Sequence, residues 1–236
     1  MALSANTNRN LFGLTALSAW VGFGLSFVIE TFGWVKVKAT DPITPDSQFG
    51  HVGNYADGLA GAGHRLTDLL SYFTTWSQIV VGIVFTLLWL KPTREEKWLK
   101  PALVDALIMI TITGIVYNAL IGPFYPPQGL NKLSSPIEHT LTPVLAVVVF
   151  LVAGPRGWFS LRSMKQALVL PIIYIIYTLI RGAFINQYPY DFLDVVSHGY
   201  MYVTIFILGI LTFAILIMWL YMIIDRRLNR KIVVPS

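Results

Sequence analysis

The sequence predicts an all-α, polytopic integral membrane protein with six transmembrane helices and both termini in the cytoplasm. Hydrophobic residues make up 55% of the 236 residues and charged residues 12%, which is about half the charged share of a soluble domain. The apolar residues gather into runs of about 20, long enough to cross a bilayer. We therefore expect one transmembrane domain over residues 1–236. The absence of cysteine excludes a thiolate metal site and a cysteine nucleophile.

Proline and glycine separate the predicted spans. Lys91-Pro92, Gly122-Pro123 and Gly154-Pro155 are pairs through which a helix does not continue cheaply. Pro171 lies inside the fifth run and predicts a kink or a packed contact there. A long outer loop, about residues 35–66, joins the first two spans. The predicted spans cover residues 11–34, 67–90, 101–122, 136–154, 166–182 and 199–224.

Basic residues predict the orientation of these spans. The N-terminus, the second and fourth loops and the C-terminal tail together carry 12 Lys and Arg residues, and the other side carries 5. Because short cytoplasmic loops are enriched in Lys and Arg, both termini are expected in the cytoplasm. The net charge of +5 thus reflects membrane topology, and we expect no nucleic-acid partner.

Polar side chains of the spans gather toward the outer end. His139 lies four residues into the fourth run, and an ionisable group in hydrocarbon is costly and usually functional. At 1.5 Å per residue, His139 lies about 5 Å below Pro136 and Thr74 about 10 Å below Thr67, so the two can meet. A neutral imidazole can take the proton of a hydroxyl and so activate it for acyl transfer. Hydrogen bonding within or between helices is the alternative for both residues.

Other polar residues at this end are candidates for substrate binding. Asn118 can donate a hydrogen bond to a developing oxyanion, and Arg181 can hold a carboxylate or phosphate or extend to the interface. Asp194 and His198 precede the sixth span and can contact substrate or form a solvated ion pair. Asp68 and Asp194 are both candidates to orient the imidazole of the histidine.

Three stretches in this order resemble the androgen-induced protein family and its microbial relatives: residues 71–78 (SYFTTWSQ), 138–143 (EHTLTP) and 188–194 (YPYDFLD). The resemblance implies a membrane threonine hydrolase that cleaves fatty acid esters of hydroxy fatty acids. It implies Thr74 as the nucleophile and His139 as the base, with Pro143 as the proline that follows the histidine. Thr75 stays a rival nucleophile, because residues 75–78 depart from the Gln-Ser-Asn continuation of the relatives. The outer loop is also longer than in the animal enzymes.

We therefore predict an intramembrane hydrolase of lipid esters, in the plasma (inner) membrane of a prokaryote, whose substrate enters from the outer leaflet. This mechanism needs no metal and no other cofactor. A metal-dependent hydrolase with His139, His198 and an acidic residue as ligands is a second hypothesis. A non-enzymatic lipid-binding or transport protein is the third, although the chain shows no inverted repeat. The sequence does not fix an oligomeric state.

Overall fold

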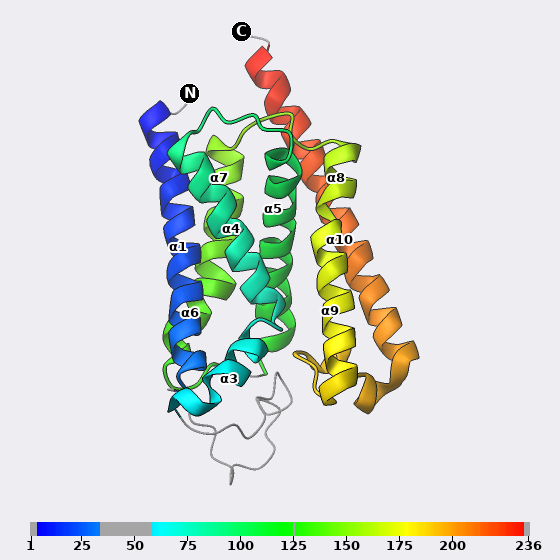
Figure 1. Ribbon diagram of the computed structural model, residues 1–236. Helices are drawn as coiled ribbons and strands as arrows, with labels where there is room; N and C mark the ends of the chain where they lie inside the picture. The colour runs from blue at the N-terminus through cyan, green and yellow to red at the C-terminus, as the bar shows by residue number, and fades with distance from the viewer. Residues whose placement is uncertain (1–3, 34–57, 125, 234–236) are drawn as a thin grey trace.

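The computed structural model describes residues 4–33, 58–124 and 126–233 (Figure 1). Helices account for most of these residues, and no β-strand occurs among them. The all-α class and the six apolar runs are confirmed. Six helical segments are long and apolar enough to cross a membrane: Ala5–Thr31, Phe73–Leu90, Leu99–Ile121, Asn131–Ala153, Leu161–Ile185 and Val195–Arg230.

Four helices pack together into the main body of the protein, and three more stand beside it (Figure 1). The first and last described residues lie at one end of the bundle, so the chain returns to its starting side. The main body consists of α1 (Ala5–Thr31), α4 (Phe73–Leu90), α5 (Leu99–Val116) and α7 (Thr142–Ala153). The flanking helices are α8 (Leu161–Ala167), α9 (Val169–Ile185) and α10 (Val195–Val233).

Helix α5 is the central element. Residues 103–110 are all buried, as expected for a helix that is apolar on every face and surrounded by others. Phe85 of α4, Phe150 of α7 and Met218 of α10 belong to the same core. The outward faces of α9 and α10 carry large exposed apolar side chains, which suits a surface in contact with lipid.

The second span begins later than predicted. Residues Ala62–Leu69 form a separate short helix, α3, which follows the 3₁₀ turn η1 (Gly58–Gly61). Helix α4 starts at Phe73, so Thr74 lies in its first turn rather than about two turns below its start. The end of the predicted outer loop is thus helical, and residues 34–57 lie outside the described part.

The fifth and sixth spans are also irregular. Helices α8 and α9 join at Leu168, three residues before Pro171. Because Pro171 has no N–H to bond the carbonyl four residues earlier, the break follows from the sequence and agrees with the predicted kink. Gly199 interrupts α10 with φ 77° and ψ 161°, a conformation that only glycine adopts readily.

Two π-helical turns lie beside each other where α5 meets the fourth span. Helix α5 continues into η2 (Tyr117–Ile121), and the fourth span runs through α6 (Asn131–Pro136) and η3 (Ile137–Leu141) into α7. A π-turn inserts an extra residue, and such turns are common at functional sites. A Cβ added at Gly114 would lie 2.8 Å from Cβ of Pro143, so α5 and α7 touch just beside these turns.

Gly114→Ala is expected to destabilise the protein by about 1–3 kcal/mol, because the added methyl overlaps the ring of Pro143. Thermal unfolding in detergent measures the effect. Gly209→Ala is the matched control, since no atom lies within 4 Å of a Cβ added on α10, and alanine favours a helix over glycine. Equal melting temperatures for both variants would show that α5 and α7 separate more easily than the contact indicates.

Candidate active site

The structure places Thr74 and His139 in contact. Oγ1 of Thr74 lies 3.2 Å from Nε2 of His139. Thr74 comes from the first turn of α4, and His139 from the π-turn η3. Both residues are partly exposed, so the pair is shielded by the protein without being sealed inside it. The start of α4 lies at the end of the bundle opposite the termini (Figure 1).

The second nitrogen of the imidazole fixes which atom carries the proton. Nδ1 of His139 lies 3.0 Å from the backbone oxygen of Ser135 and 3.1 Å from its hydroxyl. A carbonyl oxygen only accepts hydrogen bonds, so Nδ1 of the neutral ring carries the hydrogen. Nε2 is then unprotonated and accepts the hydrogen bond of the Thr74 hydroxyl. This arrangement is the one that general-base activation requires.

Tyr117 fixes the plane of the imidazole. Its ring stacks on His139 with centroids 3.7 Å apart and an interplanar angle of 16°. The hydroxyl of Ser135 donates to the Tyr117 hydroxyl over 2.7 Å. Stacking and hydrogen bonding thus hold the ring in one orientation while its Nε2 faces Thr74.

Asn118 joins the two π-turns instead of facing the nucleophile. Because Pro143 has no N–H, it leaves the carbonyl of His139 without its usual helical donor. Nδ2 of Asn118 donates to that carbonyl over 2.7 Å and to the carbonyl of Gly114 over 2.8 Å. The hydroxyl of Thr140 donates to Asn118 Oδ1 over 3.3 Å. Both amide hydrogens are used, so the predicted oxyanion role of Asn118 finds no geometric support.

Thr75 points away from the histidine. Its side chain is only 3% exposed, and its hydroxyl donates to the backbone oxygen of Leu69 over 2.8 Å. The indole of Trp76 donates to the next carbonyl, that of Leu70, over 2.8 Å. Thr75 and Trp76 therefore supply hydrogen-bond donors to the backbone carbonyls at the end of α3. Of the two threonines, Thr74 is the one that contacts His139.

Arg181 forms an ion pair with Asp68, which joins the end of α9 to α3. The pair is largely buried, with side-chain exposures of 15% for Arg181 and 5% for Asp68. The guanidinium predicted to bind substrate is thus already held by a carboxylate. The proposal that Asp68 orients the imidazole was wrong, because Ser135 contacts Nδ1.

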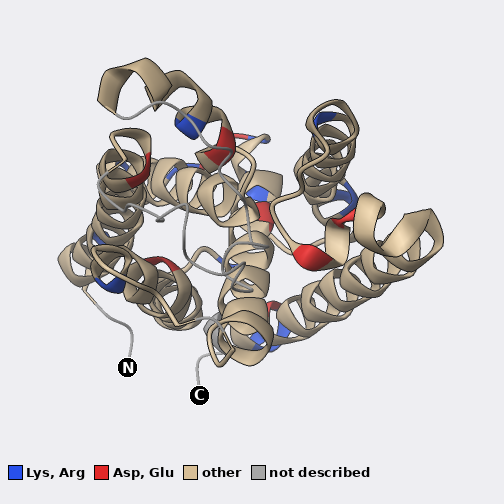
Figure 2. Cartoon of the chain, turned by 90° about the horizontal axis from the view of Figure 1, so that it is seen from below, with Lys and Arg blue, Asp and Glu red and all other residues tan. Residues whose placement is uncertain are grey.

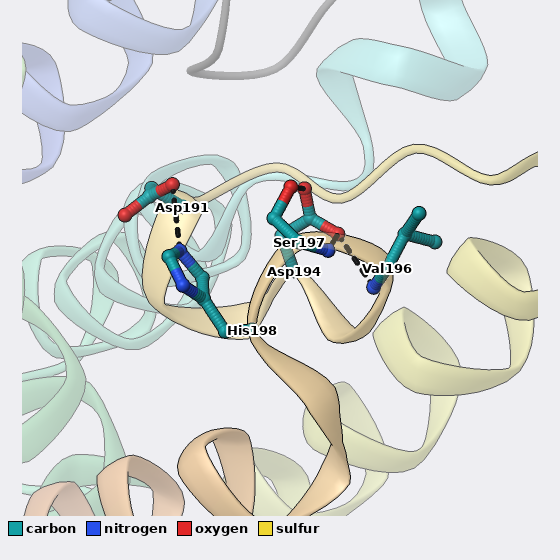
Figure 3. A network of polar contacts seen from close by, with 5 residues as sticks. All are labelled: Asp191, Asp194, Val196, Ser197 and His198. Carbon is teal, nitrogen blue, oxygen red and sulfur yellow. Dashed lines mark hydrogen bonds and ion pairs between the residues drawn. The ribbon is translucent and has the colours of Figure 1, made fainter.

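Asp194 and His198 form a separate network at the start of α10 (Figure 3). The carboxylate of Asp194 accepts from the backbone N–H groups of Val196 and Ser197 and from the Ser197 hydroxyl, as an N-cap residue does. Nε2 of His198 lies 3.0 Å from Oδ1 of Asp191, so the predicted pairing of His198 with Asp194 was wrong. Asp194 was also a candidate to orient the imidazole of His139, but Nδ1 of His139 contacts Ser135 instead.

The metal hypothesis required His139 and His198 to meet. His139 instead contacts Thr74 and Ser135, while His198 contacts Asp191. Within residues 4–33, 58–124 and 126–233, no three His, Cys, Asp or Glu side chains come together as metal ligands.

Sequence reasoning missed several residues around the pair. Glu138 is buried, its Oε2 accepts from the Ser26 hydroxyl over 2.9 Å, and its backbone oxygen accepts from the Gln78 amide over 2.8 Å. These bonds hold η3 against α1 and α4. Nothing in the sequence pointed to these bonds of Glu138. The contact of Ser135 with His139 did have a signal, because Ser135 lies one helical turn before the histidine.

No protein-family model, curated protein or solved structure matches this chain. The chemistry of the site is therefore inferred from its geometry. That geometry consists of a hydroxyl in contact with the unprotonated nitrogen of an imidazole, whose other nitrogen bonds a carbonyl oxygen.

Proposed function

We propose that the protein is a membrane-embedded hydrolase of lipid esters, with Thr74 as the nucleophile and His139 as the general base. The observation that carries this proposal is the 3.2 Å contact between Thr74 Oγ1 and His139 Nε2. The bond from Nδ1 to the Ser135 carbonyl supports it, because it leaves Nε2 free to accept a proton. The proposal agrees with the resemblance to the androgen-induced protein family.

The reaction would proceed through an acyl-threonine. Thr74 Oγ1 attacks the ester carbonyl while His139 Nε2 takes the hydroxyl proton, and the carbonyl electrons move onto its oxygen. The product of this attack is a tetrahedral intermediate. Its collapse breaks the ester bond to the alcohol, which leaves and takes the proton from His139. Water then attacks the acyl carbon while His139 Nε2 takes a proton from it. The bond between that carbon and Thr74 Oγ1 breaks, the fatty acid leaves, and His139 returns the proton to Oγ1. Ser135 would accept the Nδ1 hydrogen bond and stabilise the imidazolium at each stage.

The surroundings of the site support a lipid substrate. The pair lies near one end of six apolar helices, where an ester group at the level of the headgroups can reach it while its acyl chain stays among the helices. In the view from this end (Figure 2), Lys, Arg, Asp and Glu colour only short stretches of the helices, and most of the chain is uncharged. With the termini in the cytoplasm, as the Lys and Arg distribution predicts, the site would open to the outer leaflet of a prokaryotic plasma membrane.

Labelling with a fluorophosphonate probe tests the proposal directly. Purified protein in detergent is expected to carry the label on Thr74, located by peptide mapping, because only an activated hydroxyl attacks the phosphorus. Thr74→Ala and His139→Ala are expected to lose the label while remaining folded. Thr75→Ala is expected to keep it. A folded wild-type protein that stays unlabelled, beside a serine hydrolase that reacts in the same detergent, would favour a lipid-binding protein without activity.

A further inference from the structure

The hydroxyl of Tyr190 lies at the start of α4, next to the proposed nucleophile. It accepts a hydrogen bond from the backbone N–H of Phe73 over 3.0 Å. Thr74, the next residue along the chain, lies in the same first turn of α4. Tyr190 belongs to the third of the stretches that carry the family resemblance, residues 188–194, to which the proposed mechanism has so far given no role.

Aromatic neighbours hold the phenol of Tyr190 in place. Its ring stacks on Phe192 with centroids 5.1 Å apart and an interplanar angle of 3°. Tyr72 packs against it edge to face with a centroid distance of 6.0 Å. The backbone N–H of Leu193 donates to the Tyr190 carbonyl over 2.9 Å. The hydroxyl is thus preorganised, which is what an effective electrostatic contact in catalysis needs.

Tyr190 stays protonated at neutral pH. Burial raises the pKa of its hydroxyl above the ordinary value, and the hydrogen bond from the Phe73 N–H offsets only part of this shift. A tyrosine hydroxyl has two acceptor lone pairs and one hydrogen to donate. In the bond from the Phe73 N–H, the Tyr190 hydroxyl acts as the acceptor. Its own O–H hydrogen is therefore not used in that bond and can be donated to a neighbouring oxygen.

Attack by Thr74 on an ester creates a negative oxygen that needs a hydrogen-bond donor. Asn118 cannot serve, because both of its amide hydrogens bond backbone carbonyls. We propose that Tyr190 is a further catalytic residue, whose O–H donates a hydrogen bond to the oxygen of the tetrahedral intermediate. The inference rests on the proposed hydrolase function. The proton of Tyr190 stays on its own oxygen throughout, while the proton of Thr74 goes to His139 and then to the leaving alcohol.

Tyr190→Phe tests this role. With a p-nitrophenyl ester of a long-chain fatty acid as substrate, we expect kcat to fall roughly 10²–10³-fold and KM to change little. Tyr188→Phe removes a hydroxyl two residues away and is the matched control, with wild-type kcat expected. The ring of Tyr188 packs against Gly182 of α9. Wild-type kcat in Tyr190→Phe would overturn the inference.

An inhibitor pair separates oxyanion binding from a structural role. A long-chain trifluoromethyl ketone forms a negatively charged adduct with Thr74, whereas the uncleavable ether analogue of the substrate does not. Tyr190→Phe is expected to weaken binding of the ketone by about the factor by which it lowers kcat/KM. Binding of the ether should stay unchanged. Equal weakening of both inhibitors would mean that Tyr190 only shapes the site.

Replacing Tyr190 by 3-fluorotyrosine keeps the ring and the hydroxyl and covers the case in which Tyr190→Phe does not fold. Because the fluorinated hydroxyl ionises at lower pH and then cannot donate, activity should be lost at lower pH than in wild type. An unchanged alkaline limb of the pH profile would overturn the role of Tyr190. Wild-type protein that neither takes up the fluorophosphonate label nor hydrolyses esters would instead overturn the hydrolase function itself.

Discussion

Thr74→Ala is expected to lower kcat/KM for ester hydrolysis by roughly 10⁴-fold or more, because it removes the atom that forms the acyl-enzyme. The melting temperature should stay near wild type, since Thr74 is partly exposed and its hydroxyl bonds the side chain of His139. Initial rates with a long-chain p-nitrophenyl ester, together with a thermal scan in the same detergent, measure both quantities. Thr74→Ser is expected to retain measurable activity, because it keeps the hydroxyl.

Thr75→Ala is the control for this prediction. It removes a buried hydroxyl that bonds the Leu69 carbonyl, so it should cost about 1 kcal/mol of stability and leave the turnover of folded protein near wild type. The opposite pattern, in which Thr75→Ala is inactive and Thr74→Ala is active, would move the nucleophile by one residue. It would also require α4 to rotate relative to η3.

The contact between Thr74 and His139 was predicted from depth, although one premise of that argument was wrong. The predicted second span starts at Thr67, whereas Thr67 belongs to α3 and the span itself starts at Phe73. The fourth span starts earlier than predicted, at Asn131. Hydropathy locates a span because lipid demands apolar length, but it does not separate a short end helix from the span that follows.

The partners of the other polar residues depend on helix rotation, which composition does not record. Asn118 was expected near the oxyanion, but the π-turn η2 directs its amide toward the carbonyl that Pro143 leaves free. The proline was visible in the sequence, whereas the π-turn that brings Asn118 to this carbonyl was not. An ion pair between His198 and Asp194 was one of two predicted alternatives, but Asp194 caps α10 and His198 contacts Asp191.

Helix irregularities build the whole candidate site. The proposed nucleophile lies where α4 begins, the proposed base lies in the π-turn η3, and the tyrosine that stacks on this histidine lies in η2. In a regular helix the backbone groups bond one another, so an interrupted helix is what frees N–H and carbonyl groups for a site inside a membrane. Pro143 and the break before Phe73 supply these interruptions.

Arg181→Gln is expected to destabilise the protein by about 3–5 kcal/mol, because it leaves the buried carboxylate of Asp68 without its guanidinium. Unfolding in detergent measures this loss. Adding Asp68→Asn should restore part of the stability, since the buried charge is then removed. Arg94→Gln is the control, because the pair of Arg94 with Glu96 is more exposed and such pairs contribute about 0–1 kcal/mol. The result also decides the role first predicted for Arg181. If Arg181 binds substrate, Arg181→Gln should raise KM and leave the melting temperature unchanged. If Arg181 joins α9 to α3, the same substitution should lower the melting temperature and leave the KM of folded protein near wild type.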